Sequence, residues 1–202
     1  MDFKSLYLSD IQRYGKESPG RGLKRFHYYL RKAQTVRNKL LQIYYRWQYK
    51  RIREQYHLEI FAPTKIGKGL YLGHPYGITV NPKAVLGDNV NLHKGVTIGQ
   101  ENRGRRKGIP TIGSCVWIGI NTTIVGNITI GDDVLIAPNT YVNCDVPSHS
   151  VVYGNPCIIK RMYNATQHYV NNVVPMSDPE KEKEIWCGEE QWRKSLEAEQ
   201  QQ

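Results

Sequence analysis

The sequence has no long hydrophobic run, and nowhere does it reach the roughly 18 consecutive apolar residues that a membrane-spanning helix needs. The first 30 residues carry charges and tyrosines in place of the apolar stretch of a secretory signal, so a cytoplasmic protein is expected. Cysteines are few and lie far apart, without the paired spacing or nearby histidines of a zinc site. We therefore expect no metal and four free, buried thiols: Cys115, Cys144, Cys157 and Cys187.

Acidic residues are also scarce, with 18 Asp and Glu against 28 Lys and Arg, and the imbalance lies near the N-terminus. Residues 1–57 hold 14 basic and 4 acidic residues. Apolar residues at spacings of three and four over residues 23–47 predict an amphipathic helix there. We interpret residues 1–56 as a basic helical segment that packs on its own domain or a partner subunit. Peripheral membrane contact is the minority alternative, and no nucleic-acid partner is expected.

Aliphatic residues recur every six positions through the middle of the chain. A helix would need a period of 3.6, and a hairpin strand would alternate for only a few residues before its turn, so neither fits. Short strands separated by Gly, Asn, Asp and Pro instead predict a three-sided coil, stacked as a parallel β-helix. The inward positions are Val80, Leu86, Leu92, Ile98, Ile112, Ile118, Ile124, Ile130, Ile136 and Val142.

Two interruptions break this period. A two-residue slip falls at GHPYGI (residues 73–78), and a longer insertion at QENRGRRKGIP (residues 100–110) is expected to form an extruded loop. Arg105 and Arg106 of the loop could contact the phosphates of a ligand or an acceptor substrate. Alternatively, they could serve only to keep the loop soluble. The predicted β-helix domain covers residues 57–161. Residues 162–202 are expected to form a C-terminal helix that caps the open end, or a flexible tail.

Three motifs carry a family resemblance: EIFAPTKIGKGLYLGHPYG (residues 59–77), AVLGDNVNLHKGVTIG (residues 84–99) and GNITIGDDVLIAPNTYVNCDVPSHSVVYGNP (residues 126–156). Over about half of its length the chain resembles serine acetyltransferases of the hexapeptide-repeat acyltransferase superfamily. The resemblance implies a left-handed parallel β-helix, acetyl-CoA as co-substrate, and a homotrimer that could pair into a dimer of trimers. It also implies O-acetyl transfer, which in serine acetyltransferases serves cysteine biosynthesis.

The resemblance also suggests which residues do the chemistry. His74 matches the family's general base and Glu59 the acidic residue that orients it, because a hydroxyl must lose its proton to attack a thioester. His93 is the competing base or a residue that lines the site, whereas His149 is expected to be a solvated turn residue. The implied cofactor contacts are Thr97, Gly99, Gly119 and Ala137 for the pantetheine arm, and Lys160 or Arg161 for the nucleotide phosphates.

The sequence departs from serine acetyltransferases where they grip serine. Gly73 stands where they usually carry an Asp, and the extruded loop lacks their histidine. An ammonium group buried without its carboxylate partner would be costly. Three functions therefore remain open: a serine O-acetyltransferase, an O-acetyltransferase acting on a sugar or a capsule or envelope polysaccharide, and a non-catalytic β-helical scaffold.

Overall fold

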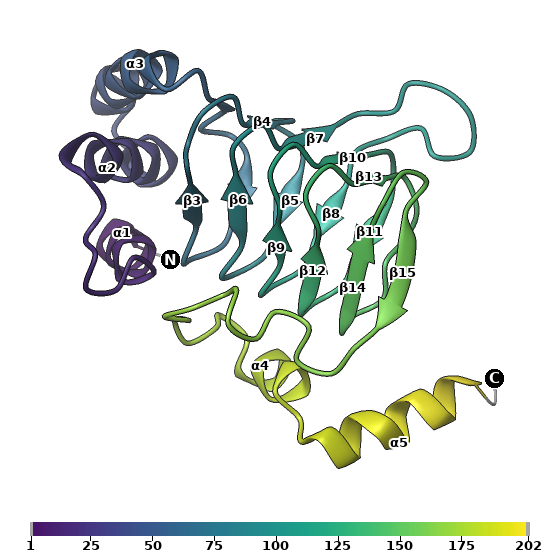
Figure 1. Cartoon of the computed structure of the whole chain (residues 1–202). Coiled ribbons are helices and arrows are strands. Elements are labelled where there is room, and N and C mark those ends of the chain that lie inside the picture. The colour runs from purple at the N-terminus through teal and green to yellow at the C-terminus, as the bar shows by residue number, and fades with distance from the viewer. Residues whose placement is uncertain (1, 201–202) are drawn as a thin grey trace.

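The computed structural model describes residues 2–200 and consists of a β-helix with helices against one end and one side (Figure 1). Its helices are α1 (Phe3–Gln12), α2 (Arg21–Thr35), α3 (Lys39–Gln55), α4 (Pro179–Ile185) and α5 (Glu189–Gln200). Each coil before the last contributes one short strand to each of three sheets, which we call sheets A, B and C, and the last coil adds a strand to sheets A and C. Because neighbouring strands in a sheet come from successive coils, the pairing is parallel, as predicted.

The strands follow the chain around the three sheets in turn. Sheet A holds β1 (Glu59–Ile60), β4 (Thr79–Val80), β7 (Thr97–Gly99), β10 (Thr123–Val125) and β13 (Tyr141–Val142). Sheet B holds β2 (Lys65–Ile66), β5 (Val85–Leu86), β8 (Thr111–Ile112) and β11 (Thr129–Ile130). Sheet C holds β3 (Tyr71–Gly73), β6 (Asn91–His93), β9 (Trp117–Ile118), β12 (Val134–Ile136), β14 (Ser150–Tyr153) and the antiparallel β15 (Ile158–Arg161).

The aliphatic residues that recur every six positions fill the interior of this β-helix. All ten predicted inward residues are buried, with no more than 2% of any of them exposed. The slip at residues 73–78 also appears in the strand pairing. Glu59 pairs with Thr79, twenty positions later, whereas Thr123 pairs with Tyr141 after eighteen. The first coil is therefore two residues longer than a regular one, and the extra residues lie beside His74.

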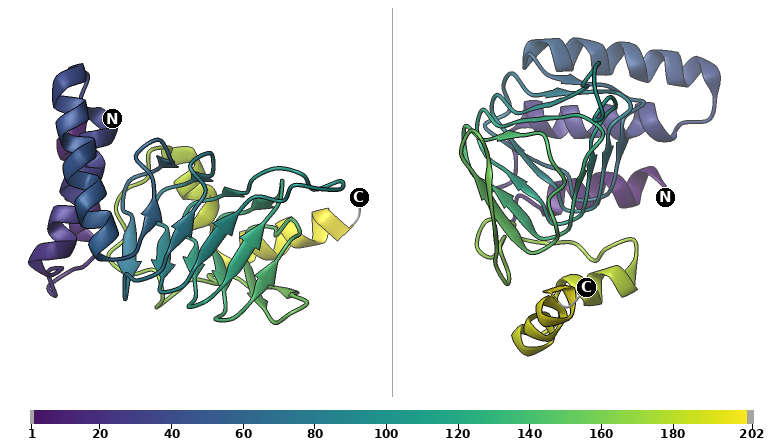
Figure 2. Two further views of the ribbon diagram at one scale, coloured as in Figure 1. Left: turned by 90° about the horizontal axis from the view of Figure 1, so that it is seen from above. Right: turned by 90° about the vertical axis from the view of Figure 1, so that its right-hand side faces the viewer.

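The N-terminal helices cover the first coil of the β-helix (Figure 2). The amphipathic helix predicted over residues 23–47 is in fact two helices, because Asn38 caps a new helix by accepting hydrogen bonds from the N–H groups of Leu40 and Leu41. The apolar stripe is divided accordingly: Phe26 and Leu30 are buried against the coil, whereas Trp47 on α3 is half exposed.

A buried ion pair attaches these helices to the coil. Asp10 of α1 accepts two hydrogen bonds from Arg31 of α2, at 2.7 and 2.8 Å, and one from the Leu70 N–H at 2.9 Å. Arg31 also donates to the carbonyl oxygens of Ile66 and Gly67. Since both charged side chains are fully buried, the pair holds two helices and the first coil in one arrangement.

The segment after β15 runs back along the side of the β-helix and does not cap its open end. Asp133 accepts hydrogen bonds from the N–H groups of Ala165 and Thr166, and further along Asn89 exchanges two hydrogen bonds with the backbone of Val174. Polar turn residues between sheets B and C therefore bind the returning chain. This segment brings residues 169–172 beside the loop that joins α1 to α2 (Figure 1).

The thiols differ from the expectation of four buried cysteines. Cys115 is buried, but Cys144, Cys157 and Cys187 are partly exposed. The Sγ atoms of Cys144 and Cys157 lie 3.7 Å apart as free thiols. Both lie in the turns that follow strands of the last coils, β13 and β14.

We predict that Asp10→Asn lowers the free energy of unfolding by about 3–5 kcal/mol, because Arg31 would remain buried without a counter-charge. Burial raises the pKa of Asp10, but Arg31 and His27 lower it by more, so the net pKa lies below its usual range. The wild type should therefore lose this stabilisation as pH falls through that lowered pKa, and Asp10→Asn should not.

The measurement is chemical denaturation from neutral to acidic pH. Glu54→Gln is the matched control, because it removes a carboxylate from an exposed pair with Lys50 and should change stability by less than about 1 kcal/mol. Equal effects of the two substitutions would contradict the structural role of Asp10.

Candidate active site

The strands of sheet C end at a corner where the chain turns into sheet A, and we call this the C–A corner. Strand register places Gly73, His93, Gly119 and Ala137 one above another there, since Gly73 pairs with His93 and the neighbouring pairs Leu92–Ile118 and Ile118–Ile136 continue the column. His74 follows Gly73 directly. Stacking alone therefore gathers four of the sequence-predicted site residues at one corner.

Glu59 and Thr97 begin strands of sheet A on the other side of the same corner. Both pair with Thr79, so they flank one strand. The Glu59 carboxylate is exposed and accepts a hydrogen bond of 3.4 Å from the Thr79 hydroxyl. Within residues 2–200 it makes no hydrogen bond to His74, whose side chain is exposed on a residue with φ of 50°. Glu59 and His74 share the corner without forming the predicted dyad in the single chain.

Of the two histidines at this corner, His93 is the one whose ring is oriented by a hydrogen bond. Its Nδ1 lies 2.8 Å from the carbonyl oxygen of Ile118. A carbonyl can only accept, so Nδ1 carries the proton and Nε2 keeps its lone pair. Burial lowers the pKa of His93, the Ile118 carbonyl offsets part of this, and the nearby His74 lowers it further. A neutral imidazole with a free Nε2 is the form that can accept a proton or a hydrogen bond from a hydroxyl group.

The ring of His93 lies directly over Gly73. A Cβ atom added to Gly73 would overlap Cδ2 of His93 and would lie 2.5 Å from its Nε2. The Asp that serine acetyltransferases usually carry at this position therefore cannot be accommodated while His93 keeps its place. A side chain at position 73 and the observed position of the His93 ring therefore compete for the same space.

The extruded loop lies at the opposite edge of sheet A, because it follows β7 and precedes β8. Arg105 and Arg106 are exposed and line a cavity of about 430 Å³ with Val125 and Asn143. Gly99 pairs with Val125 and lies at the same edge. The predicted contacts thus form two groups, one at each edge of sheet A.

The remaining predicted residues lie elsewhere. Lys160 is exposed on β15, and Arg161, the next residue, lines a separate cavity with Asp132 and Glu184 beside α4. Neither is brought together with Thr97, so their contact with nucleotide phosphates stays a prediction.

His149 is not a solvated turn residue: it is 9% exposed, and its Nδ1 lies 2.8 Å from the Asp133 carboxylate that holds the returning chain.

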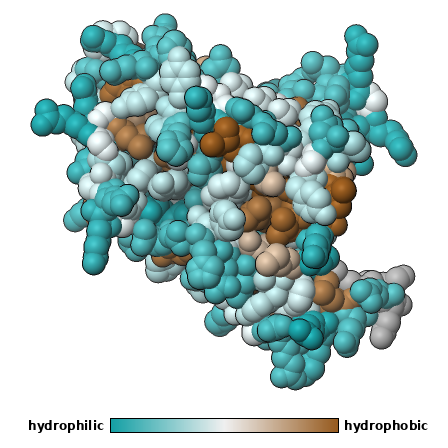
Figure 3. Space-filling model, viewed as in Figure 1, coloured by the Kyte–Doolittle hydropathy of each residue, from teal (hydrophilic) through white to brown (hydrophobic). Residues whose placement is uncertain are grey.

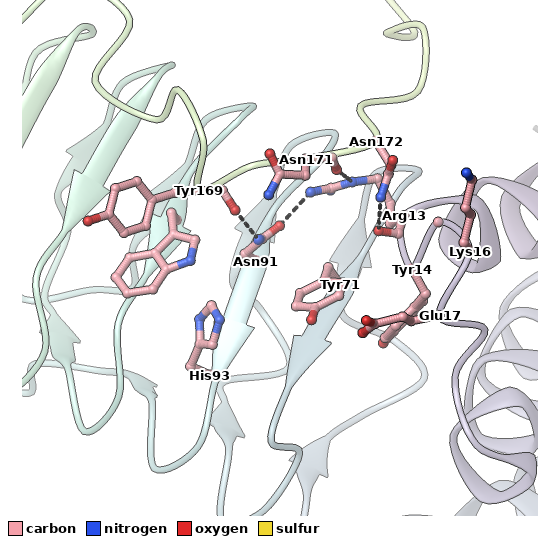
Figure 4. A pocket seen from close by; sticks show the side chains of 12 residues that line it. Arg13, Tyr14, Lys16, Glu17, Tyr71, Asn91, His93, Tyr169, Asn171 and Asn172 are labelled. Atoms are coloured by element: carbon pink, nitrogen blue, oxygen red, sulfur yellow. Dashed lines mark hydrogen bonds between the residues drawn. The ribbon is translucent and has the colours of Figure 1, made fainter.

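A pocket that the sequence does not indicate lies on the outer face of sheet C, next to the C–A corner (Figure 4). His93 lines it together with Tyr71, Trp117 and Asn91, and the other walls come from residues 13–17 and 169–172. We call this the sheet C pocket. The outward positions of β3, β6 and β9 could have suggested an aromatic surface, but nothing in the six-residue period indicates that the two distant segments enclose it.

Residues 2–200 show neither a clustered metal-ligand set nor a membrane-spanning helix. They contain no group of three or more His, Cys, Asp and Glu side chains placed to hold a metal ion. None of the helices described is both long and apolar enough to cross a membrane.

Comparison with known proteins gives a consistent family. Residues 109–144 match the family model "Bacterial transferase hexapeptide (six repeats)". Over 106 residues the chain is 40% identical to serine acetyltransferase 4 of Arabidopsis thaliana, a match that covers 52% of this chain. The chain is a serine acetyltransferase-like hexapeptide-repeat protein. The match covers only 30% of the Arabidopsis protein, so less than two thirds of that relative is represented here.

Solved structures agree with this likeness. The soybean serine acetyltransferase complexed with serine superposes with a TM-score of 0.68 at 25% identity, covering 79% of this chain and 70% of that one. The serine acetyltransferase of Brucella abortus strain S19 in complex with coenzyme A gives a TM-score of 0.66 at 28% identity, covering 79% and 68%. The likeness thus extends beyond the β-helix, since 79% of the chain is aligned.

We predict that Gly73→Asp destabilises the serine acetyltransferase-like chain by about 1–3 kcal/mol, because the new side chain must displace the His93 ring. In a His93→Ala background the overlapping atoms are gone, so the same substitution should cost clearly less. A double-mutant cycle by chemical denaturation measures this coupling.

Gly20→Asp is the control for adding a carboxylate at a glycine. A Cβ at Gly20 meets nothing within 4 Å, and the residue caps α2, where an acidic side chain is favoured. Additive effects of Gly73→Asp and His93→Ala would show that the two positions do not compete for space.

Proposed function

We propose that the protein is an acetyl-CoA-dependent O-acetyltransferase and that the acceptor hydroxyl reacts at the C–A corner. The observation that carries this proposal is the convergence of His74, His93 and Glu59 at one corner of a serine acetyltransferase-like β-helix. Serine is the acceptor suggested by the relatives' names, and a sugar hydroxyl is the alternative favoured by the absence of an acidic residue at position 73.

In the proposed reaction His74 is the general base. Its imidazole takes the proton of the acceptor hydroxyl as the oxygen attacks the thioester carbon of acetyl-CoA. The tetrahedral intermediate then collapses, the C–S bond breaks, and the imidazolium returns the proton to the sulfur of CoA. Glu59, at the start of the same coil, would stabilise the imidazolium. Both substrates are held together, so no covalent acyl-enzyme is required.

Acetyl-CoA would lie along sheet A. Its acetyl end would reach the corner near Thr97, Gly119 and Ala137, and its phosphates would reach the arginines of the extruded loop at the other edge. The exposed Arg105 and Arg106 suit phosphate groups because guanidinium groups form charge-assisted hydrogen bonds with them.

We predict that His74→Ala lowers turnover by roughly 10²–10⁴-fold without loss of folding, the usual effect of removing a general base. Release of CoA from acetyl-CoA, with a panel of serine and sugars as acceptors, measures it. Glu59→Gln should reduce turnover less, because it removes only the charge that stabilises the imidazolium.

His93→Ala is the critical comparison. His93 is the alternative general base, because its Nε2 has a free lone pair. Normal turnover in His74→Ala together with a large loss of turnover in His93→Ala would assign the role to His93. If no acceptor accelerates CoA release beyond hydrolysis, the chain would instead be a scaffold.

We also propose a homotrimer, in which the corner of one subunit faces a neighbouring β-helix. The face seen in Figure 3 carries an apolar patch over sheet C. Near the last coils the exposed side chains of Ile120, Tyr153 and Ile158 would be buried by such a contact. Light scattering at micromolar concentration should give a mass of three chains or a multiple of three, and a monomer would contradict the proposal.

A further inference from the structure

The sheet C pocket has a volume of about 360 Å³, which falls in the range of roughly 300–1,000 Å³ typical of small-molecule sites. It is built from parts that are distant in sequence. The floor is the outer face of β3, β6 and β9, and the walls are the loop between α1 and α2 and the returning C-terminal segment (Figure 4). His93 lies at the side of the pocket that borders the C–A corner.

Aromatic rings line the floor and both walls. The centroids of Tyr14 and Tyr71 lie 4.7 Å apart, those of His93 and Trp117 4.6 Å, and those of Trp117 and Tyr169 5.1 Å. Tyr71 and His93 connect the two halves at 6.2 Å. The rings form a continuous series, and such a surface presents negative ring faces to a ligand with polarised C–H groups.

Several polar groups of the pocket have no partner in the part of the chain described. Among the hydrogen bonds of residues 2–200, none involves the Tyr71 hydroxyl, the Trp117 indole N–H or the side-chain oxygen of Asn172. His93 adds the lone pair of Nε2. The pocket thus offers neutral donors and acceptors beside aromatic faces.

The buried charged group of the pocket, the Arg13 guanidinium, already has hydrogen-bond partners within the protein. The Arg13 guanidinium is buried and donates to the carbonyl oxygens of Asn171 and Gly69 and to the side-chain oxygen of Asn91. It therefore holds the walls together. Lys16 and Glu17, the other charged lining residues, are exposed at the rim. A free amino acid would place an ammonium and a carboxylate against neutral groups, which is unfavourable.

We propose that the sheet C pocket is the acceptor subsite and binds a neutral pyranose. One face of the sugar ring packs on Trp117 and Tyr71, its hydroxyl groups bind the free polar groups, and one hydroxyl donates to Nε2 of His93. The ring is then held next to the C–A corner, where an adjacent hydroxyl accepts the acetyl group. This inference rests on the proposed acetyl transfer and names the class of its acceptor.

Kinetics with neutral methyl hexopyranosides test the subsite. We expect CoA release to be accelerated by at least one of the methyl glycosides of glucose, galactose, mannose and N-acetylglucosamine, and not by serine. Trp117→Leu should raise the KM for that sugar roughly 10-fold, the loss of one stacked ring, with kcat within about twofold. Trp47→Leu is the matched control, because Trp47 lies half exposed on α3, far from the pocket lining.

A direct binding measurement separates failure of the subsite from failure of the enzyme. Saturation-transfer NMR with the same glycosides, without acetyl-CoA, should detect binding that Trp117→Leu and Tyr71→Leu weaken. Binding of this kind without any CoA release would uphold the subsite and overturn acetyl transfer. Acceleration by serine alone, or equal sugar binding in wild type and both variants, would overturn the subsite.

Discussion

Stacking of the coils is the constraint on which the site depends. In a parallel β-helix each strand hydrogen-bonds to the equivalent strand of the next coil, so equivalent residues are held within one strand spacing, about 4.8 Å. Gly73, His93 and Gly119 are consequently neighbours although 46 residues separate the first from the last. No loop has to fold in a special way to collect them. Functional side chains can occupy only the outward positions of the strands and the corners, because the inward positions fill the core.

The sequence predicts the part of the fold that repeats. The period of six identifies the ten inward aliphatic residues from Val80 to Val142, the slip at residues 73–78 and the loop at residues 100–110, since burial imposes that spacing directly. The same spacing places His74, His93 and Gly119 at one corner. It contains no information on the returning C-terminal segment, whose attachment depends on single turn residues such as Asp133 and Asn89. For this reason His149 was misjudged as solvated, and the sheet C pocket was not foreseen.

The break at Asn38 illustrates the same limit in the helical part. The apolar spacing continues from Leu30 to Trp47, so periodicity alone describes a single helix, and only the capping geometry of Asn38 divides it. Because the cap redirects the chain, α2 can bury its apolar stripe against the first coil while α3 runs back alongside α2 (Figure 2). Arg31 can then reach both Asp10 and the carbonyl oxygens of the coil.

Gly73 and His93 connect the architecture to the choice of acceptor. The two residues are paired across β3 and β6, so a larger side chain at one position requires a smaller one at the other. An acidic residue at position 73 would provide a counter-charge for an ammonium group, whereas the imidazole at position 93 provides a neutral acceptor for a hydroxyl group. At this pair the chain therefore offers a neutral hydrogen-bond acceptor and no counter-charge. In this chain the space is occupied by the imidazole, and its Nδ1–H is already bound to Ile118. The rings of Tyr71 and Trp117 contact His93 on either side and extend this uncharged surface along sheet C.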